Sequence, residues 1–242
     1  MQLIEIGIQN FKSLKSVTLK PGPLSVFIGP NGSGKSNLCE ALDFIGEMYR
    51  SALNVAMTTH GGYERLTYAG SNLPTSTLGF RVQASLSKRD LERTWMGEPN
   101  VDAPHEIVIT HELSIGVGSD RVHDPYRIVE EHVRYDGKIT ARSRSEEIIR
   151  IDKRGDVVQM SASPYALQHL RSSRHLSAED AQNVVTATLE SSETPLVAWT
   201  MEALVLPSVP LRASLGAVSL YKLESDQLRR GGVPTPPPRL GR

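Results

Sequence analysis

The sequence predicts an α/β fold in which a strand–loop–helix element is joined to an antiparallel, β-rich subdomain. Two observations lead to this prediction. A glycine-rich loop at residues 29–36 stands between a short apolar run and an amphipathic helical pattern, which is the order of a P-loop unit. From residue 78 onward, apolar and polar residues alternate in several segments separated by turn residues, as is typical of antiparallel strands. A chain of 242 residues can bury one sizeable core with a small appended subdomain.

The N-terminal element is expected to contain three short strands, the loop and a helix. Apolar patterns predict strands at residues 3–8 and 17–19. Residues 24–28 read Leu-Ser-Val-Phe-Ile, which is typical of a strand buried on both faces. Apolar residues recur at helical spacing over residues 38–52, so an amphipathic helix should follow the loop. Residues 54–76 contain several glycines and predict an extended connection.

The β-rich part is predicted from patterns of period two. Strands are expected at residues 78–86, 105–113 and 126–135, and Asp136-Gly137 is a strong signal for a hairpin turn after the last of them. A further hairpin is expected from two strands at residues 148–151 and 157–160, with its turn at residues 153–155.

The same patterns suggest four segments along the chain. These are a nucleotide-binding element, a β-rich subdomain, a helical or mixed segment with a helix at 178–189, and a connector rich in proline and glycine; their respective ranges are 1–76, 77–165, 166–228 and 229–242.

Composition narrows the function classes. The 27 basic and 27 acidic side chains cancel, so global charge gives no argument for nucleic-acid binding. No apolar run is long enough to predict a membrane span, and the N-terminus lacks the layout of a signal peptide. Cys39 is the single cysteine, which excludes an internal disulfide and a thiolate cluster for zinc. A cytoplasmic location is the natural expectation.

The loop matches G-x-x-x-x-G-K-[ST] at every fixed position, and its residues are Gly29, Pro30, Asn31, Gly32, Ser33, Gly34, Lys35 and Ser36. Its glycines would let successive backbone N–H groups turn inward around phosphate oxygens. The following helix would add its unpaired N–H groups and its positive dipole end. Lys35 would reach the outer phosphates, and the Ser36 hydroxyl would ligate Mg²⁺. The motif therefore predicts a bound nucleotide together with Mg²⁺.

ATP is favoured over GTP. A GTPase needs an Asp-x-x-Gly switch and, later in the chain, an Asn-Lys-x-Asp base reader. Residues 152–155 and 87–90 imitate these two motifs but occur in the wrong order, and the second lacks its asparagine. Both segments are better interpreted as turn and strand-end residues.

Three stretches resemble the ABC-type ATPase heads of the RecF, SMC and OLD group. They are residues 8–14 (Ile-Gln-Asn-Phe-Lys-Ser-Leu), residues 27–38 around the loop, and residues 40–42 (Glu-Ala-Leu). The likeness covers residues 1–50 and is strongest to bacterial AAA-family ATPases that are similar to RecF. It implies the N-terminal lobe of a P-loop NTPase head of ABC/SMC type, with the β-rich subdomain added to it.

The resemblance also implies site residues and partners. Asn37 follows the loop as is usual in the group, and Lys12 would approach the nucleotide from the first hairpin; a solvated hairpin lysine is the alternative for Lys12. Such heads dimerise head to head around ATP and work in DNA repair or phage defence, so DNA is a possible partner. No membrane partner is expected.

Part of the family's machinery has no counterpart in the sequence. Heads of this group have an apolar strand that ends in Asp-Glu, and no such dipeptide occurs here. Ser214-Leu-Gly216 is only a fragment of the serine-glycine signature. We therefore expect an N-terminal half, completed by a C-terminal half or a partner subunit and inactive as an ATPase by itself. A nucleotide-binding regulatory or assembly module that does not hydrolyse ATP is the alternative.

Other candidate groups carry less weight. His105 and His111 lie on one side of the same predicted strand and His132 nearby, but a six-residue separation spans roughly 20 Å, too far for a shared metal. The adjacent glutamates at 130–131 and 146–147 would point to opposite faces of a strand and are interpreted as solvated edges. Cys39 is expected to pack rather than react.

Overall fold

The computed structural model describes residues 1–51, 53–68, 70, 77–94, 104–117, 126–155, 157–167, 177, 179–180 and 215–217. Its strands are β1 (Gln2–Phe11), β2 (Leu14–Leu19), β3 (Leu78–Ser87), β4 (Glu106–Val117), β5 (Tyr126–Lys138), β6 (Glu146–Arg154) and β7 (Val157–Ala162). Its helices are α1 (Lys35–Arg50), α2 (Leu53–Thr59), α3 (Tyr63–Leu66) and α4 (Lys88–Thr94). None of these helices combines the length and the apolar character needed to cross a bilayer.

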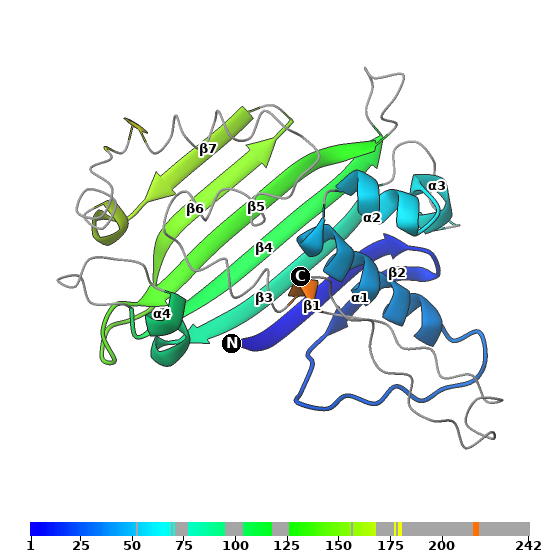
Figure 1. The fold of residues 1–242 in the computed structure, drawn as a ribbon, viewed down its shortest axis with the longest axis horizontal. Helices are drawn as coiled ribbons and strands as arrows, with labels where there is room; N and C mark the ends of the chain where they lie inside the picture. The colour runs from blue at the N-terminus through cyan, green and yellow to red at the C-terminus, as the bar shows by residue number, and fades with distance from the viewer. Residues whose placement is uncertain are drawn as a thin grey trace, which may run out of the picture.

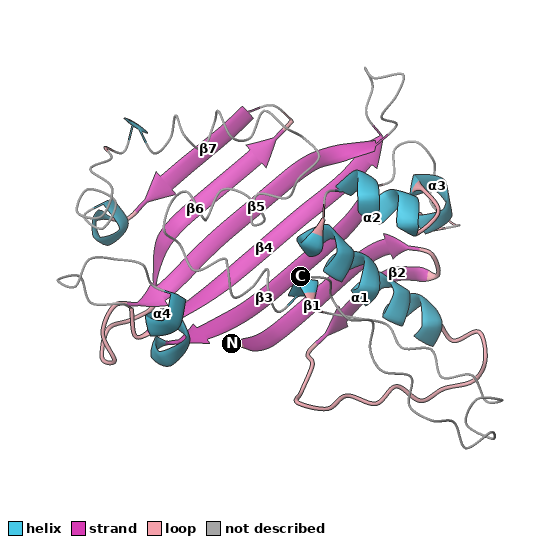
Figure 2. Ribbon diagram, in the orientation of Figure 1, coloured by secondary structure: helices cyan, strands magenta, loops and turns pink. Residues whose placement is uncertain are grey.

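The strands form one seven-stranded sheet in the order β2-β1-β3-β4-β5-β6-β7, and every neighbouring pair is antiparallel. Helices α1 and α2 lie across one face of this sheet, over the strands near its N-terminal edge (Figure 1). The secondary-structure colouring shows a mostly antiparallel sheet with few helices (Figure 2). The helix that follows the loop is therefore seated on a sheet made from both early and later parts of the chain.

The period-two pattern places apolar side chains on the face that the helices cover. In β3 the buried residues alternate with partly exposed ones along the whole strand. An aromatic cluster joins three elements: the Phe44 ring of α1 lies 5.9 Å from the Phe11 ring of β1 and 5.4 Å from the Phe80 ring of β3. All three rings are buried, so this cluster is the apolar contact that fixes the middle of α1 on the sheet.

A buried polar chain fixes the C-terminal part of the same helix. The Tyr49 hydroxyl lies 2.5 Å from Nδ1 of His111 on β4, and Nε2 of that histidine lies 2.7 Å from Oε1 of Glu131 on β5. Each of the three side chains is at most 1% exposed. A neutral imidazole with its proton on Nε2 satisfies both contacts, accepting from the tyrosine and donating to the carboxylate. Burial, and then the negative charge of Glu131, raise the pKa of the Tyr49 hydroxyl well above its ordinary value, which keeps it a donor.

The predicted strand at residues 24–28 is wrong in this structure. The segment is a loop, and its side chains are exposed, with Leu24 at 83% and Ile28 at 92%. In Figure 1 the segment runs away from the sheet before it returns to α1. A strand forms only where a neighbour supplies backbone partners, and no described strand lies beside this run.

Two further predictions are corrected. The extended connection at 54–76 contains the short helices α2 and α3, separated by Gly61 and Gly62, whose φ angles of 88° and 90° end one helix and precede the next. Asp136-Gly137 does not form a turn, because both residues are paired inside β5, with Val108 and Ile107 of β4. Strand pairing with β4 thus overrides a local turn preference.

The remaining strand and helix predictions are confirmed within the described residues. The strands at 3–8, 17–19, 78–86, 105–113 and 126–135, and the hairpin at 148–160, appear as β1 to β7, and the helix over 38–52 appears as α1. Gly155 has a φ of 56° in the turn between β6 and β7, although Lys153 belongs to the strand and not to the turn. The predicted helix at 178–189 and the connector at 229–242 lie essentially outside the described residues.

The buried polar chain leads to a testable prediction. Tyr49→Phe removes the donor to Nδ1 of His111 and leaves that buried nitrogen unpaired, so the free energy of unfolding should fall by about 1–3 kcal/mol. Tyr126→Phe is the matched control, because this part-buried ring at the start of β5 has no hydroxyl bond among those described. Denaturant titration followed by circular dichroism measures both. Equal stability of the two variants would contradict the structural role of the chain.

Candidate nucleotide-binding site

The loop at 29–36 has the backbone shape that its glycines allow. Gly32 and Gly34 have φ angles of 81° and 92°, in the left-handed region that favours glycine. The Ser33 amide donates to the Pro30 carbonyl at 3.3 Å, closing a turn. A Cβ at Gly34 would lie 3.3 Å from side-chain atoms of Leu14 and Ser13. Gly34 is therefore required twice, by its φ angle and by the hairpin packed against it.

Helix α1 begins directly after this loop with its first amide groups uncapped. Gly34 is the N-cap and supplies no side-chain bond, and the Leu38 amide makes the first bond within the helix, to the Gly34 carbonyl at 2.9 Å. The amides of Lys35, Ser36 and Asn37 therefore have no partner within the helix. Together with the positive end of a 16-residue helix dipole, they form a donor set that fits an anion.

The Lys35 side chain is folded back onto the loop. Its ammonium group donates to the carbonyl oxygens of Gly29 at 2.7 Å and Pro30 at 2.8 Å, and lies 3.2 Å from Oγ of Ser33. The ammonium group thus lies inside the curve of the loop, where the phosphate oxygens of a bound nucleotide would also lie. The Ser36 side chain, the predicted Mg²⁺ ligand, is exposed at the start of the helix.

The first hairpin is tied to α1 beside the loop. The Asn37 amide group donates to Oγ of Ser13 at 2.7 Å. Lys12, which has a positive φ of 49° in the hairpin turn, forms an ion pair with Glu40 of α1. His60 is mostly buried, and one ring nitrogen lies 3.9 Å from the same Glu40 carboxylate. Asn37 and Lys12 are therefore both near the helix start, but Lys12 is paired with a carboxylate of α1 in this structure.

Other predicted groups lie apart from the loop. Glu131 was expected on a solvated edge, which is wrong: it is 0% exposed and bonded to His111, because strand alternation places it on the covered face with Val133 and Tyr135. His132 is on the opposite face, bonded to Asp152. Within the described ranges no group of three His, Cys, Asp or Glu side chains could hold a metal ion. Cys39 is a free, part-buried thiol.

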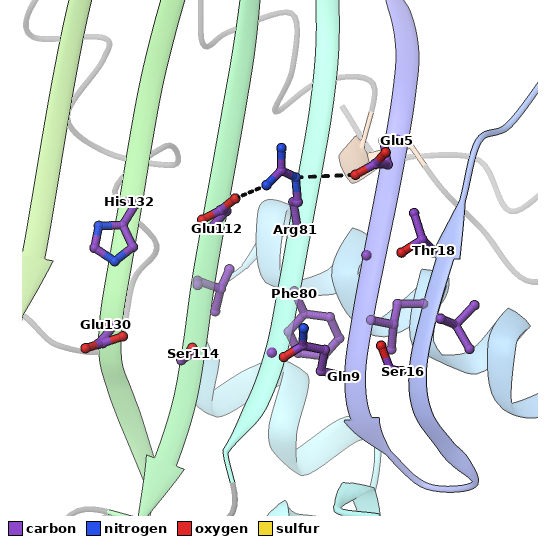
Figure 3. Close-up of a pocket in the computed structure, with 15 residues that line it drawn as sticks. Glu5, Gln9, Ser16, Thr18, Phe80, Arg81, Glu112, Ser114, Glu130 and His132 are labelled. Atoms are coloured by element: carbon purple, nitrogen blue, oxygen red, sulfur yellow. Dashed lines mark hydrogen bonds and ion pairs between the residues drawn. The ribbon is translucent and has the colours of Figure 1, made fainter.

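The sheet has a separate hollow of about 330 Å³ on the face away from α1. Figure 3 shows it with the helices behind the sheet, and with Glu5, Arg81 and Glu112 aligned across β1, β3 and β4. None of its lining residues belongs to the loop. Sequence reasoning missed this hollow because its lining comes from five strands, β1 to β5, which only the folded sheet brings side by side.

Comparison with known proteins matches the N-terminal part of the chain. Residues 1–77 match the family model described as an AAA ATPase domain. The DNA replication and repair protein RecF of Anaeromyxobacter sp. (strain Fw109-5) is 33% identical over 88 residues, which are 35% of this chain and 24% of that protein. The chromosome partition protein Smc of Methanococcus voltae is 38% identical over 76 residues, 28% of this chain and 6% of that protein. The OLD nuclease of Thermus scotoductus is 36% identical over 50 residues, 20% of this chain and 10% of that protein.

The N-terminal segment is similar to the ATPase heads of the RecF, SMC and OLD group. These matches confirm the resemblance inferred from residues 8–42, and each spans a quarter or less of the relative's own length. A solved structure, titled for ATP-driven dimerization and DNA-stimulated activation of SMC ATPases, aligns with 60% of this chain and 72% of that chain. The alignment has 19% identity and a TM-score of 0.30, which is too low to argue from. The likeness to the RecF, SMC and OLD group therefore rests on the sequence of the N-terminal segment.

A pair of glycine substitutions tests the loop geometry. Gly34→Ala and Gly32→Ala both place a Cβ at a positive φ, but only position 34 also has neighbours within 3.3 Å, whereas position 32 has none within 4 Å. Both should lower the free energy of unfolding by about 1 kcal/mol through backbone strain, and Gly34→Ala should cost a further ~1 kcal/mol or more through crowding against the hairpin. Thermal unfolding of the two variants measures the difference. If Gly32→Ala is the more damaging change, the packing of the hairpin on the loop is contradicted.

Proposed function

We propose that the loop at residues 29–36 binds the phosphates of ATP together with Mg²⁺, as part of a RecF/SMC/OLD-like ATPase head. The observation that carries this proposal is the convergence of one donor set at the start of α1: three uncapped helix amides, the Lys35 ammonium and two serine hydroxyls. All of these groups donate hydrogen bonds or carry positive charge, and this is the chemistry that a polyphosphate requires. The location of the loop in a segment that matches the AAA ATPase domain supports the same function.

Each residue has a role in this proposal. The amides of Gly32, Ser33 and Gly34 and of the first helical turn would bind phosphate oxygens, while Gly29, Pro30 and Asn31 shape the loop. Lys35 would exchange its two carbonyl partners for the outer phosphates. Ser36 would ligate Mg²⁺, which would neutralise phosphate charge when bound. Asn37 would hold the hairpin through Ser13, and Lys12 would add a second cation once released from Glu40.

The exposed apolar run at residues 24–28 supports the proposal that a second half completes the head. Seven large hydrophobic side chains are exposed among the described residues. Four of them lie in this run: Leu24, Val26, Phe27 and Ile28. An apolar segment without a strand neighbour is a site for pairing with another segment or chain. We propose that it becomes a strand beside the part of the head that carries the Asp-Glu acid and the serine-glycine signature.

For the whole protein we propose ATP hydrolysis by a head-to-head dimer that acts on DNA, in repair or phage defence and in the cytoplasm. The names of the RecF relatives, which describe DNA replication and repair proteins, support this process. Hydrolysis needs an oriented water and a carboxylate that organises Mg²⁺, in addition to the loop. The sequence has no Asp-Glu dipeptide to supply that carboxylate, so we propose that this chain alone binds ATP without turnover. A nucleotide sensor that never hydrolyses ATP is the second candidate, and the lack of this dipeptide favours it.

Lys35→Ala tests the binding site. The change removes the cation from the outer phosphates while the fold is retained, so ATP affinity measured by calorimetry with Mg²⁺ should fall at least about tenfold, equivalent to 1.4 kcal/mol. Lys15→Ala is the matched control, since this exposed lysine on β2 carries the same charge. Unchanged affinity in a folded Lys35→Ala protein would refute the assignment of the loop.

Steady-state phosphate release tests whether the chain is self-sufficient. With saturating ATP and Mg²⁺, the isolated chain should release phosphate no faster than Lys35→Ala does, because the loop lacks a carboxylate to orient water. Turnover that Lys35→Ala abolishes would instead show that a catalytic carboxylate lies within this chain.

A further inference from the structure

The face of the sheet away from α1 places two like charges directly opposite each other. Arg134 of β5 and Arg150 of β6 are register partners in the antiparallel pair. Directly opposed like charges destabilise a strand pair, and ordinary surfaces place opposite charges there, as Glu130 and Arg154 do on the same two strands. The arginine pair therefore calls for an explanation other than sheet stability.

Each of these arginines is held by an aspartate two residues further along its own strand. Nε of Arg134 donates to Oδ2 of Asp136 at 2.7 Å, and Nε of Arg150 donates to Oδ2 of Asp152 at 2.7 Å. Oδ1 of Asp152 is also bonded to Nδ1 of His132 at 2.6 Å, which fixes that carboxylate in place. Because both aspartates bind through Nε, they orient the two guanidinium groups without occupying their Nη donors. The two arginine side chains are 47% and 51% exposed, so those donors are accessible.

The arginine pair lines a hollow of about 390 Å³. Two more arginines and a histidine contribute to the same hollow, and its charged and titratable lining residues are Arg81, Glu112, His132, Arg134, Arg150, Asp152 and Arg154. Arg81 is itself held between Glu5 and Glu112. The hollow thus has guanidinium groups on strands β3, β5 and β6, and each of these four groups is paired with a carboxylate.

We infer that Arg134 and Arg150 form a clamp for a phosphate group on the open face of the sheet. A guanidinium group presents planar paired donors that match the oxygens of a phosphate, and a tetrahedral oxyanion has enough oxygens for two such groups at once. An anion between the two arginines also removes their mutual repulsion. Exposed Arg–Asp pairs contribute little to stability, and they account for the aspartates but not for two arginines opposed in register.

The clamp is separate from the proposed nucleotide site. Helix α1 lies over the other face of the sheet, as Figures 1 and 3 show, and no loop residue lines the hollow. The phosphate could belong to a polynucleotide backbone or to a small free phosphate, and the chemistry at the clamp is the same for both. The inference does not depend on ATP binding, so every protein in its test carries Lys35→Ala.

The first experiment uses inorganic phosphate as the probe. In the Lys35→Ala background, phosphate is titrated while the arginine Nε–H signals are followed by NMR. We expect saturable shifts at Arg134 and Arg150, and an apparent dissociation constant at least about tenfold higher for Arg134→Gln/Arg150→Gln. The matched control is Arg142→Gln/Arg144→Gln, which removes the same charge from exposed positions between β5 and β6 and should bind as the parent does.

A variant that keeps the charge separates geometry from electrostatics. Arg134→Lys/Arg150→Lys retains both positive charges but lacks the planar donors, so it should bind phosphate more weakly than the parent and more strongly than the glutamine variant. Circular dichroism checks that each protein is folded. If the glutamine variant does not fold, phosphate binding by the lysine variant is compared with that of the parent protein. Equal binding by the glutamine variant and its control, or by the lysine variant and the parent, would overturn the clamp.

A second arm distinguishes the two sources of the phosphate. A fluorescent single-stranded oligonucleotide is titrated into the same proteins at several salt concentrations. If the clamp holds a polynucleotide backbone, the glutamine variant should lose about 1.4 units from the slope of log affinity against log salt, as expected for two phosphate contacts. If only inorganic phosphate responds to the substitutions, the ligand is a small phosphate. If neither probe responds, the inference fails.

Discussion

The seating of α1 on the antiparallel sheet is the constraint on which the rest of the structure depends. The helix starts at the glycine-rich loop, its middle packs through Phe44 against aromatic rings of β1 and β3, and its C-terminal part is held by Tyr49. These contacts come from strands far apart in the sequence. A shift or rotation of the helix would therefore break apolar packing and a buried hydrogen bond together, and both are costly. The position of the loop is set by the sheet through the helix.

The buried polar chain gives this seating its specificity. Apolar packing alone tolerates small rotations of a helix, whereas the hydroxyl of Tyr49 has to meet one ring nitrogen of His111. The histidine is in turn held by Glu131, which lies opposite the buried Lys153 in the register of β5 and β6. Buried charges are stable only when they are partnered. The row of buried polar side chains therefore extends the constraint from α1 to strands β4, β5 and β6.

The sheet separates two kinds of chemistry. Its covered face carries the apolar core and the helix that begins at the phosphate loop, while its open face carries charged side chains in register across the strands. Because alternate residues of a strand point to opposite faces, neighbours such as Glu130 and Glu131 have unrelated roles. One is exposed beside Arg154, and the other is fully buried beside His111. A single strand thus contributes both to the core and to a charged surface.

The sequence by itself determined the features that depend on neighbours along the chain. The loop, its glycines, the helix after it and the period-two strands are encoded locally, and the family resemblance rests on the same stretch. Only the tertiary structure decided what depends on distant partners: that residues 24–28 stay exposed, that Asp136-Gly137 continues a strand, and that Arg134 faces Arg150. The reason is physical. A strand, a buried carboxylate or a charged pair acquires its energy from the residue across from it, and strand register, which selects that residue, is a property of the assembled sheet.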